Sequence, residues 1–148
     1  MTEHAMTDEE LSALGLATIV AIPDAVIYCD PKGRIRFWNE GAERIFGHSA
    51  DEAIGQSLDI IIPQRLRKRH WDGFFAMMKT GQSRYGPSEL LCVPAMTRSG
   101  ATISIQFTAA ATTDAAGKVT GIVSILRDET ETYEELRRLR MAVDGSKG

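Results

Sequence analysis

Residues 90–127, LLCVPAMTRSGATISIQFTAAATTDAAGKVTGIVSILR, contain three apolar-rich segments separated by two glycine-containing turns. In the middle segment Ile103, Ile105 and Phe107 alternate with polar residues. This period of two is typical of a strand with one buried face and one solvated face. Turns as short as these join antiparallel neighbours. The pattern therefore predicts three consecutive antiparallel strands, at residues 90–96, 101–111 and 119–127.

A shorter hairpin is predicted nearer the N-terminus. Residues 25–29 and 34–38 are apolar-rich, and the DPKG sequence at residues 30–33 between them is typical of a turn. The apolar period then becomes helical. Local signals for helix starts and stops in this region are Gly47, Ser49 and Glu52. Two strands, several short helices and three more strands predict an α+β fold, an antiparallel sheet with helices on one face.

Both ends of the chain are predicted to be helical. Thr7 and Glu10 form a capping box, and the helix they start runs to about residue 20 as an amphipathic element that exposes Leu11 and Leu14. Residues 128–143 form the second helix, whose acidic start and basic finish suit its dipole. The seam of this helix is Thr132, Leu136, Leu139 and Val143. Both helices are expected to contact a second copy of the chain, so a homodimer is expected.

Composition excludes several classes of protein. The chain has 148 residues, with 17 Lys and Arg, 20 Asp and Glu, and a formal net charge of −3. The mild acidity argues against nucleic acid as a partner. The sequence shows neither a membrane-spanning run nor a secretory signal, so a cytoplasmic protein without a membrane partner is expected. Cys29 and Cys92 are expected to be buried free thiols. Motifs for a nucleophile with its base or for phosphate binding are missing, so no enzymatic activity is expected.

Residues 63–80, PQRLRKRHWDGFFAMMKT, carry the most informative chemical pattern. At about 100° per residue, the apolar side chains gather on one helix face with His70 near its middle. The members of this face are Leu66, His70, Phe74, Met77 and Met78. An inward-facing imidazole needs a partner, because leaving it unpaired costs about 1 to 3 kcal/mol. That partner is either a protein group such as a backbone carbonyl, or haem iron, for which neutral imidazole is a common axial ligand.

Five segments together resemble the PAS domain, a sensory fold. They are residues 24–58 (DAVIYCDPKGRIRFWNEGAERIFGHSADEAIGQSL), 61–70 (IIPQRLRKRH), 80–81 (TG), 99–108 (SGATISIQFT) and 121–130 (GIVSILRDET). The closing RDET resembles the family's Asp-Ile-Thr motif and departs from it at Glu129. The resemblance implies a five-stranded antiparallel sheet of order 2-1-5-4-3. It also implies three parts: an N-terminal cap helix (1–22), the PAS domain (23–128), and a C-terminal signalling or dimerisation helix with its tail (129–148).

Within this family, the segment RKRHWDGF at residues 67–74 resembles the haem-binding helix of PAS oxygen-sensor kinases. The resemblance implies that His70 is the axial ligand of haem b iron and that Arg84 meets a haem propionate. Leu90 stands about where those kinases carry an arginine that bonds oxygen. Carbon monoxide, nitric oxide or redox state are therefore expected signals alongside oxygen. Related haem PAS regulators suggest Met96 or Cys92 as the sixth iron ligand.

The resemblance implies an otherwise mostly apolar haem pocket. Its expected lining is Leu66, Phe74, Met77, Leu90, Ile105, Phe107 and Ser124. Ser124, on the last strand, is expected to report ligand binding to the C-terminal helix, and through it to a separate effector protein, unless the chain is a fragment of a larger sensor. Two alternatives stay open. One is a cofactor-free PAS module that dimerises and docks a partner, and the other is a redox PAS domain that binds FAD beside Trp38 and Asn39.

Overall fold

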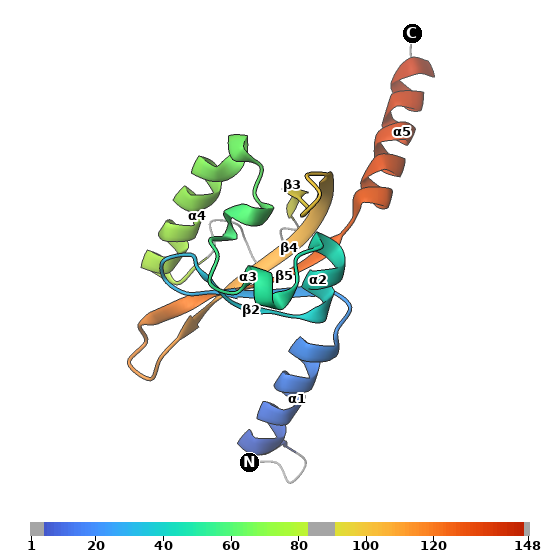
Figure 1. The fold of residues 1–148 in the computed structure, drawn as a ribbon. Coiled ribbons are helices and arrows are strands. Elements are labelled where there is room, and N and C mark those ends of the chain that lie inside the picture. Colours follow the sequence, from blue (N-terminus) through green and yellow to red (C-terminus); the bar gives the residue numbers. More distant parts are fainter. Residues whose placement is uncertain (1–4, 83–90, 147–148) are drawn as a thin grey trace.

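The computed structural model describes residues 5–82 and 91–146, and in this part of the chain a single sheet is flanked by helices (Figure 1). The helices are α1 (Asp8–Ala21), α2 (Glu40–Phe46), α3 (Ala50–Ala53), the 3-10 helices η1 (Leu58–Ile61) and η2 (Gln64–Leu66), α4 (Arg67–Thr80) and α5 (Thr130–Ser146). The strands are β1 (Ala25–Cys29), β2 (Ile35–Trp38), β3 (Leu91–Met96), β4 (Thr102–Thr113) and β5 (Val119–Asp128).

All strand pairings are antiparallel, and the strands lie in the order β2-β1-β5-β4-β3. This confirms the predicted fold class and strand order. The first strand lies between β2 and β5, with Ile27 opposite Trp38 of β2 on one side and opposite Ser124 of β5 on the other. At the far edge, β3 pairs with β4, and Val93 lies opposite Ile105. Residues far apart in the chain therefore become neighbours in the middle of the sheet.

Two hairpin turns form as their local sequences predict. In the β1–β2 turn the Asp30 carboxylate accepts backbone N–H groups two and four residues further on, both at 3.0 Å. In the β4–β5 turn Asp114 does the same, with both bonds at 2.9 Å. Gly33 and Gly117 close these turns at φ values of +82° and +84°, a left-handed conformation that favours glycine. Side chain, backbone and glycine thus specify each turn locally.

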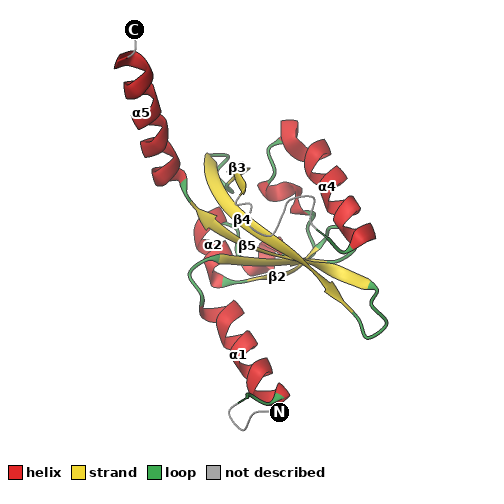
Figure 2. Ribbon diagram, turned by 180° about the vertical axis from the view of Figure 1, so that it is seen from behind, coloured by secondary structure: helices red, strands yellow, loops and turns green. Residues whose placement is uncertain are grey.

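The hydrophobic core lies between one face of the sheet and the helices that cover it, α2, α3, η1 and α4 (Figures 1 and 2). Its largest fully buried side chains are Phe46, Ile27, Ile35 and Ile61. Phe74 and Met77 of α4 belong to the same cluster, and each is 7% exposed. The helix that carries His70 therefore packs its predicted apolar face directly onto the sheet.

The prediction of two buried cysteines is correct for one of them. Both thiols are free, and Cys29 in β1 is 2% exposed, so that burial raises the pKa of its thiol to about 12. For Cys92 the prediction is wrong, because this residue is exposed. It lies on the edge strand β3, where alternation turns it away from Val93 and Ala95, which pack on the core.

The two terminal helices extend away from the sheet in opposite directions (Figure 1). The predicted capping box starts α1, where Thr7 and Glu10 exchange hydrogen bonds of 2.8 and 3.2 Å. The prediction that α1 is amphipathic is wrong, because none of its residues is buried and its apolar side chains are distributed around the helix. The exposed ones include Leu11, Leu14, Leu16 and Val20. Among the described helices, none combines the length and apolar character needed to cross a bilayer.

Candidate functional site

Helix α4 is held at both ends in a position that turns His70 toward the protein. At its start, the Arg67 side chain donates hydrogen bonds to the carbonyl oxygens of Ile62 (3.0 Å) and Asp59 (3.4 Å). At its end, Gly81 adopts a φ of +76° and closes the helix. The solvent face carries an exposed ion pair of 2.9 Å between Lys68 and Asp72. The helix therefore has the polar and apolar faces that its sequence predicts.

His70 is partly buried on the inward side of α4. Its ring lies against two aromatic neighbours, with ring centroids 4.6 Å from Trp71 and 6.1 Å from Phe74. The Nδ1 atom is buried, and no hydrogen-bond partner for it exists among the described residues. Burial lowers the pKa of the imidazole, and the negative charge of Asp59 opposes this shift. The ring is therefore held mainly in its neutral form near pH 7, the form that coordinates metals.

Trp71 and Asp59 complete the surroundings of His70, and neither residue is predicted from the sequence to belong to the site. The Trp71 indole Nε1–H donates a hydrogen bond of 2.7 Å to an Asp59 carboxylate oxygen. Its six-membered ring lies so close to Gly33 that a Cβ there would be 2.3 Å from two ring carbons. Gly33 in the β1–β2 turn and Asp59 in η1 carry no local sequence signal of their contact with Trp71. These residues come together only when the chain folds.

The structure brings together several of the predicted pocket residues. Ile105 of β4 is 4% exposed and shares the core cluster of Phe74 and Met77, while Phe107 packs against that cluster. Ser124 of β5 lies on the same face of the sheet, since the buried Ile122 and Leu126 are two positions away on either side of it. Leu66, at the end of η2, is partly buried. The α4 and β4 portions of the predicted lining therefore meet, whereas Arg84 and Leu90 lie outside the described residues.

The predicted sixth ligands, Cys92 and Met96, lie on the face of β3 that is turned away from the core. In β3, Cys92 and Met96 pair with Gln106 and Thr102, while Val93 and Ala95, which alternate with them, pack on the core. Because successive side chains of a strand point to opposite faces, neither sulfur points toward α4. Met96 or Cys92 as the sixth iron ligand therefore stays a prediction, which in this arrangement of β3 requires the strand to present its other face.

The two residues considered for flavin binding have structural roles instead. Trp38 is 3% exposed, and its indole N–H donates to the backbone carbonyl of His48 at 2.9 Å. The Asn39 side chain accepts from the backbone N–H groups of Val26 (2.8 Å) and Ala42 (2.9 Å). Its amide also donates to two carbonyl oxygens, each at 3.0 Å. These bonds join α1, β1 and α2, and they leave the Asn39 amide fully engaged.

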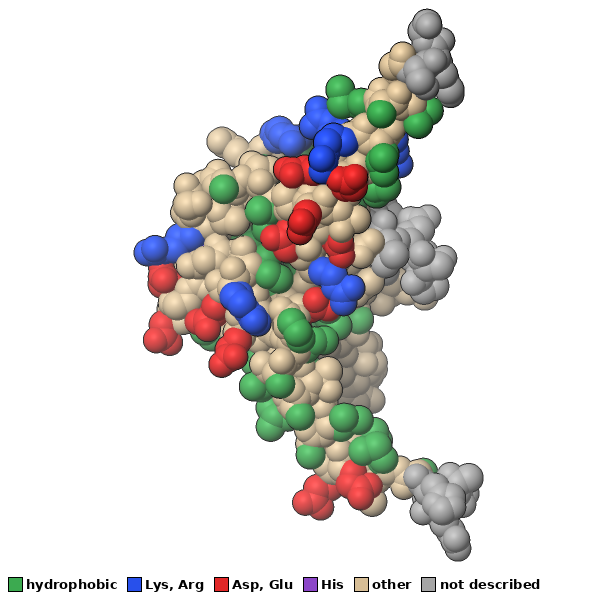
Figure 3. Space-filling model, turned by 90° about the vertical axis from the view of Figure 1, so that its right-hand side faces the viewer, with side chains coloured by type: hydrophobic (Ala, Val, Ile, Leu, Met, Phe, Trp, Pro, Cys, Tyr) green, Lys and Arg blue, Asp and Glu red, His purple; other side chains and the backbone are tan. Residues whose placement is uncertain are grey.

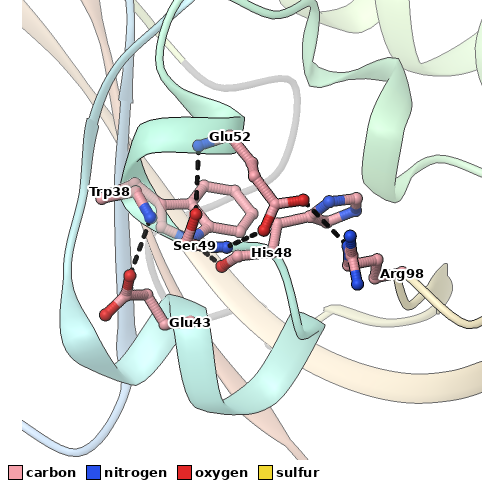
Figure 4. Close-up of polar contacts among 7 residues, drawn as sticks. Trp38, Glu43, His48, Ser49, Glu52 and Arg98 are labelled. Atoms are coloured by element: carbon pink, nitrogen blue, oxygen red, sulfur yellow. Dashed lines mark hydrogen bonds and ion pairs between the residues drawn. The ribbon is translucent and has the colours of Figure 1, made fainter.

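A polar cluster next to Trp38 connects α3 to the β3–β4 turn (Figure 4). Ser49 and Glu52 form the predicted capping box, with hydrogen bonds of 3.2 and 3.1 Å. Glu52 also pairs with Arg98 at 2.9 Å, and hydrogen bonds from Ser49 together with the charge of Arg98 lower the pKa of the Glu52 carboxyl. The Nε2 atom of His48 is buried in this region without a hydrogen-bond partner among the described residues.

A family model described as the PAS fold matches residues 20–134. The chain belongs to this family. The match covers the sheet, α2, α3 and α4, together with the ends of α1 and α5 that adjoin the sheet. The resemblance of the sequence to the PAS family is therefore confirmed at the level of the fold, and the chain is a PAS sensory domain.

Named sensor proteins are among the relatives of this PAS domain. It is 44% identical over 59 residues to the sensor protein FixL of Bradyrhizobium diazoefficiens, which covers 40% of the chain and 12% of FixL. It is 32% identical over 114 residues to the oxygen sensor protein DosP of Escherichia coli, which covers 74% of the chain and 14% of DosP. The PAS chain thus matches a small part of each of these longer relatives.

Solved structures show the same PAS architecture. The PAS domain of a protein from Colwellia psychrerythraea superposes with a TM-score of 0.72 at 19% identity. The alignment covers 82% of this chain and 98% of the Colwellia chain. At this identity the similarity establishes the common fold, and the nature of any bound ligand has to be argued from the residues of this chain.

Proposed function

We propose that this PAS domain binds haem b through His70 and senses a diatomic gas or a redox state. The observation that carries the proposal is the partly buried imidazole whose Nδ1 is enclosed without a hydrogen-bond partner among the described residues. Burial lowers the pKa of this ring, so it is available in the neutral form. A neutral, incompletely hydrogen-bonded imidazole on an apolar surface is suited to hold haem iron.

Apolar side chains close to His70 suit the faces of a porphyrin. Phe74 and Met77 of α4 share one core cluster with Ile105 of β4, and Phe107 packs against that cluster. Haem binding between α4 and the sheet requires these contacts to separate, so we expect α4 to move outward in the loaded protein. When bound, haem supplies an iron centre that takes up a diatomic ligand or changes its oxidation state.

Two similarities support the choice of signals: the relative DosP and the resemblance of the α4 sequence to that of oxygen-sensor kinases. Similarity to DosP, whose name describes an oxygen sensor, extends over 74% of the chain. The RKRHWDGF segment resembles the haem-binding helix of oxygen-sensor kinases, whereas Leu90 replaces the arginine that bonds oxygen there. Oxygen, carbon monoxide, nitric oxide and redox state are therefore the signals to test.

A route for the signal leads from the sheet to α5. Ser124 faces the core side of β5, four positions before the strand ends at Asp128. Beyond the strand, the Glu129 N–H donates to the Ser104 carbonyl at 2.8 Å, and the Ser104 N–H donates to the Thr130 hydroxyl at 3.0 Å. These bonds tie β4 to the first turn of α5, so a shift in the sheet changes the direction in which α5 leaves it.

Absorption spectroscopy during haemin titration of the purified chain tests the haem proposal. We expect an intense Soret band in the wild type and a displaced, much weaker band in His70→Gln. The matched control is His48→Gln, which alters the other histidine that has a buried unpartnered nitrogen. A wild-type spectrum in His70→Gln would show that another group holds the iron. A wild-type protein that stays colourless contradicts haem binding altogether.

A homodimer through α5 is the second part of the proposal. The exposed apolar residues on α1 and α5 are visible in Figure 3. A shallow groove on α5 is lined by Leu136, Leu139, Arg140, Val143 and Asp144. In a parallel pair of helices with Leu136 and Leu139 in the seam, Glu135 flanks the seam on one copy and faces Arg140 on the other. This arrangement places opposite charges together on both sides of the pair.

Charge reversal tests the parallel α5 pair. We expect Glu135→Arg and Arg140→Glu each to shift the sedimentation of the chain toward monomer, and the double variant to restore the dimer. Glu131→Arg and Arg137→Glu are control reversals on the same helix, outside the flanking pair. A dimer that withstands both single reversals contradicts the parallel pairing.

The cofactor-free interaction module is the alternative function, and the exposed apolar side chains of α1 and α5 are the observation that favours it. It predicts a colourless, folded dimer that does not change on haemin titration. A yellow protein with flavin absorption would instead support FAD binding. Trp38 and Asn39 already form hydrogen bonds that hold the fold together, which argues against FAD binding at these residues.

A further inference from the structure

The orientation of the His70 ring depends on packing. A metal-binding histidine usually has its ring fixed by a hydrogen bond from the nitrogen that does not hold the metal. In the described part of the chain, the buried Nδ1 of His70 has no hydrogen-bond partner, so no bond at this atom fixes the ring. A side chain on a helix surface has several staggered rotamers, so a neighbouring group has to restrict the imidazole.

Trp71 is the neighbour in closest ring contact with His70. The two ring centroids are 4.6 Å apart and the ring planes make an angle of 78°, an edge-to-face arrangement. Such pairs are favourable beyond their buried area because the positive edge of one ring meets the negative face of the other. Phe74 adds a more distant, tilted contact at 6.1 Å. The indole therefore restricts the rotation of the imidazole.

The Trp71 indole is itself immobilised at two points. Its Nε1–H donates a hydrogen bond of 2.7 Å to Asp59 in η1. Its six-membered ring fits over Gly33 of the β1–β2 turn, where the absence of a side chain makes room for it. Asp59 is in turn within 3.8 Å of the Arg67 guanidinium, one turn before Trp71 on α4. The indole thus spans from η1 to the β1–β2 turn.

We propose that Trp71 is the positioning residue for the His70 imidazole and that Asp59 anchors Trp71 in that position. The effect on haem binding rests on the proposed function, whereas the restraint of the His70 imidazole by Trp71 is a property of the haem-free chain. Loss of the Trp71–Asp59 hydrogen bond frees the indole, and the imidazole then samples additional rotamers. Iron binding is weakened accordingly, because ring orientation has to be established at the moment of binding.

Ring nuclear magnetic resonance signals of His70 in the haem-free protein provide the first test. Asp59→Asn keeps an oxygen acceptor for the indole N–H, whereas Asp59→Ala removes it. We expect one sharp set of His70 ring signals in the wild type and in Asp59→Asn, and broadened or averaged signals in Asp59→Ala. Trp71→Phe keeps an aromatic ring without the N–H and should resemble Asp59→Ala. Lys68→Ala, which removes the exposed ion pair on the same helix, is the matched control.

Haemin titration of the same variants provides the second test. Haemin affinity should fall about 10-fold to 100-fold in Asp59→Ala and Trp71→Phe and remain close to wild type in Asp59→Asn and Lys68→Ala. Unchanged His70 signals in folded Asp59→Ala and Trp71→Phe protein would overturn the positioning role. If no variant binds haemin but Asp59→Ala still perturbs the His70 signals, the positioning role stands and the haem proposal fails.

Discussion

Asp24 and Arg127 form a two-point ion pair that joins the entrance of β1 to the end of β5. The guanidinium Nε and one terminal nitrogen donate to the two carboxylate oxygens at 3.1 and 3.0 Å, across 103 positions of sequence. The Asp24 carbonyl also accepts from Asn39, whose amide donates to the Ile19 carbonyl of α1. The departure points of α1 and α5 are therefore linked at one end of the sheet.

Breaking this ion pair should affect the terminal helices more than global stability. In Asp24→Asn and Arg127→Gln we expect a small fall in the urea midpoint, because the Arg127 side chain is 62% exposed. Hydrogen exchange of the first turn of α5 should accelerate in both variants. High salt should reproduce part of the effect in the wild type and add little in the variants. Equal salt sensitivity of wild type and variants would contradict the linkage.

Asn39 should be among the most sensitive polar positions. It is 4% exposed and forms four hydrogen bonds, so Asn39→Ala leaves buried backbone groups unpaired. We expect Asn39→Ala to lower the free energy of unfolding by about 3 kcal/mol in urea titrations. Asn39→Ser keeps a helix-capping oxygen for the Ala42 N–H and should lose less. Equal losses for the two variants would show that the capping bond contributes little.

The fit of Trp71 over Gly33 predicts a difference between two glycines of similar backbone conformation. Gly117 has φ +84° and open space around it, so Gly117→Ala should cost about 1 to 2 kcal/mol of unfolding free energy from backbone strain alone. Gly33→Ala adds a steric conflict with the indole and should cost clearly more. In a Trp71→Ala background the cost of Gly33→Ala should fall to that of Gly117→Ala. Failure of this rescue would contradict the contact.

Acid should destabilise the haem-free domain partly through His70. Burial lowers the pKa of this imidazole relative to the unfolded chain, so the folded state binds fewer protons than the unfolded state. Stability therefore decreases as the pH falls through the unfolded pKa of about 6.5 toward the lower folded value. We expect the loss between pH 7.5 and 5.5, measured by urea titration, to be smaller in His70→Leu. An identical loss in both proteins would show that other groups account for it.

Predictions from short-range patterns were confirmed where neighbouring residues are sufficient for the structure. Thr7 with Glu10 and Ser49 with Glu52 form the capping boxes that their spacing indicates. Gly47 takes the left-handed conformation of a helix stop. These features depend on contacts within a few residues, which the sequence displays directly.

Predictions that needed the position of an element in the fold were less successful. The apolar run at residues 90–96 indicated a strand, but it did not show that β3 is at the sheet edge or that Cys92 points away from the core. The apolar residues of α1 indicated a helix without showing that none of them is buried. The side of a strand that becomes buried depends on which elements cover it, and this information is distributed over the whole chain.

Hydrophobic periodicity and turn chemistry were sufficient for an α+β fold and for the inward-facing position of His70, because they act locally. The order of the strands followed from the resemblance of the sequence to the PAS domain. Only the tertiary structure showed three contacts: the Trp71–Asp59 hydrogen bond, the packing of the Trp71 indole on Gly33, and the Asp24–Arg127 ion pair. Each of them joins residues from different elements, and their distances are set by how α4 packs on the sheet and how β1 pairs with β5.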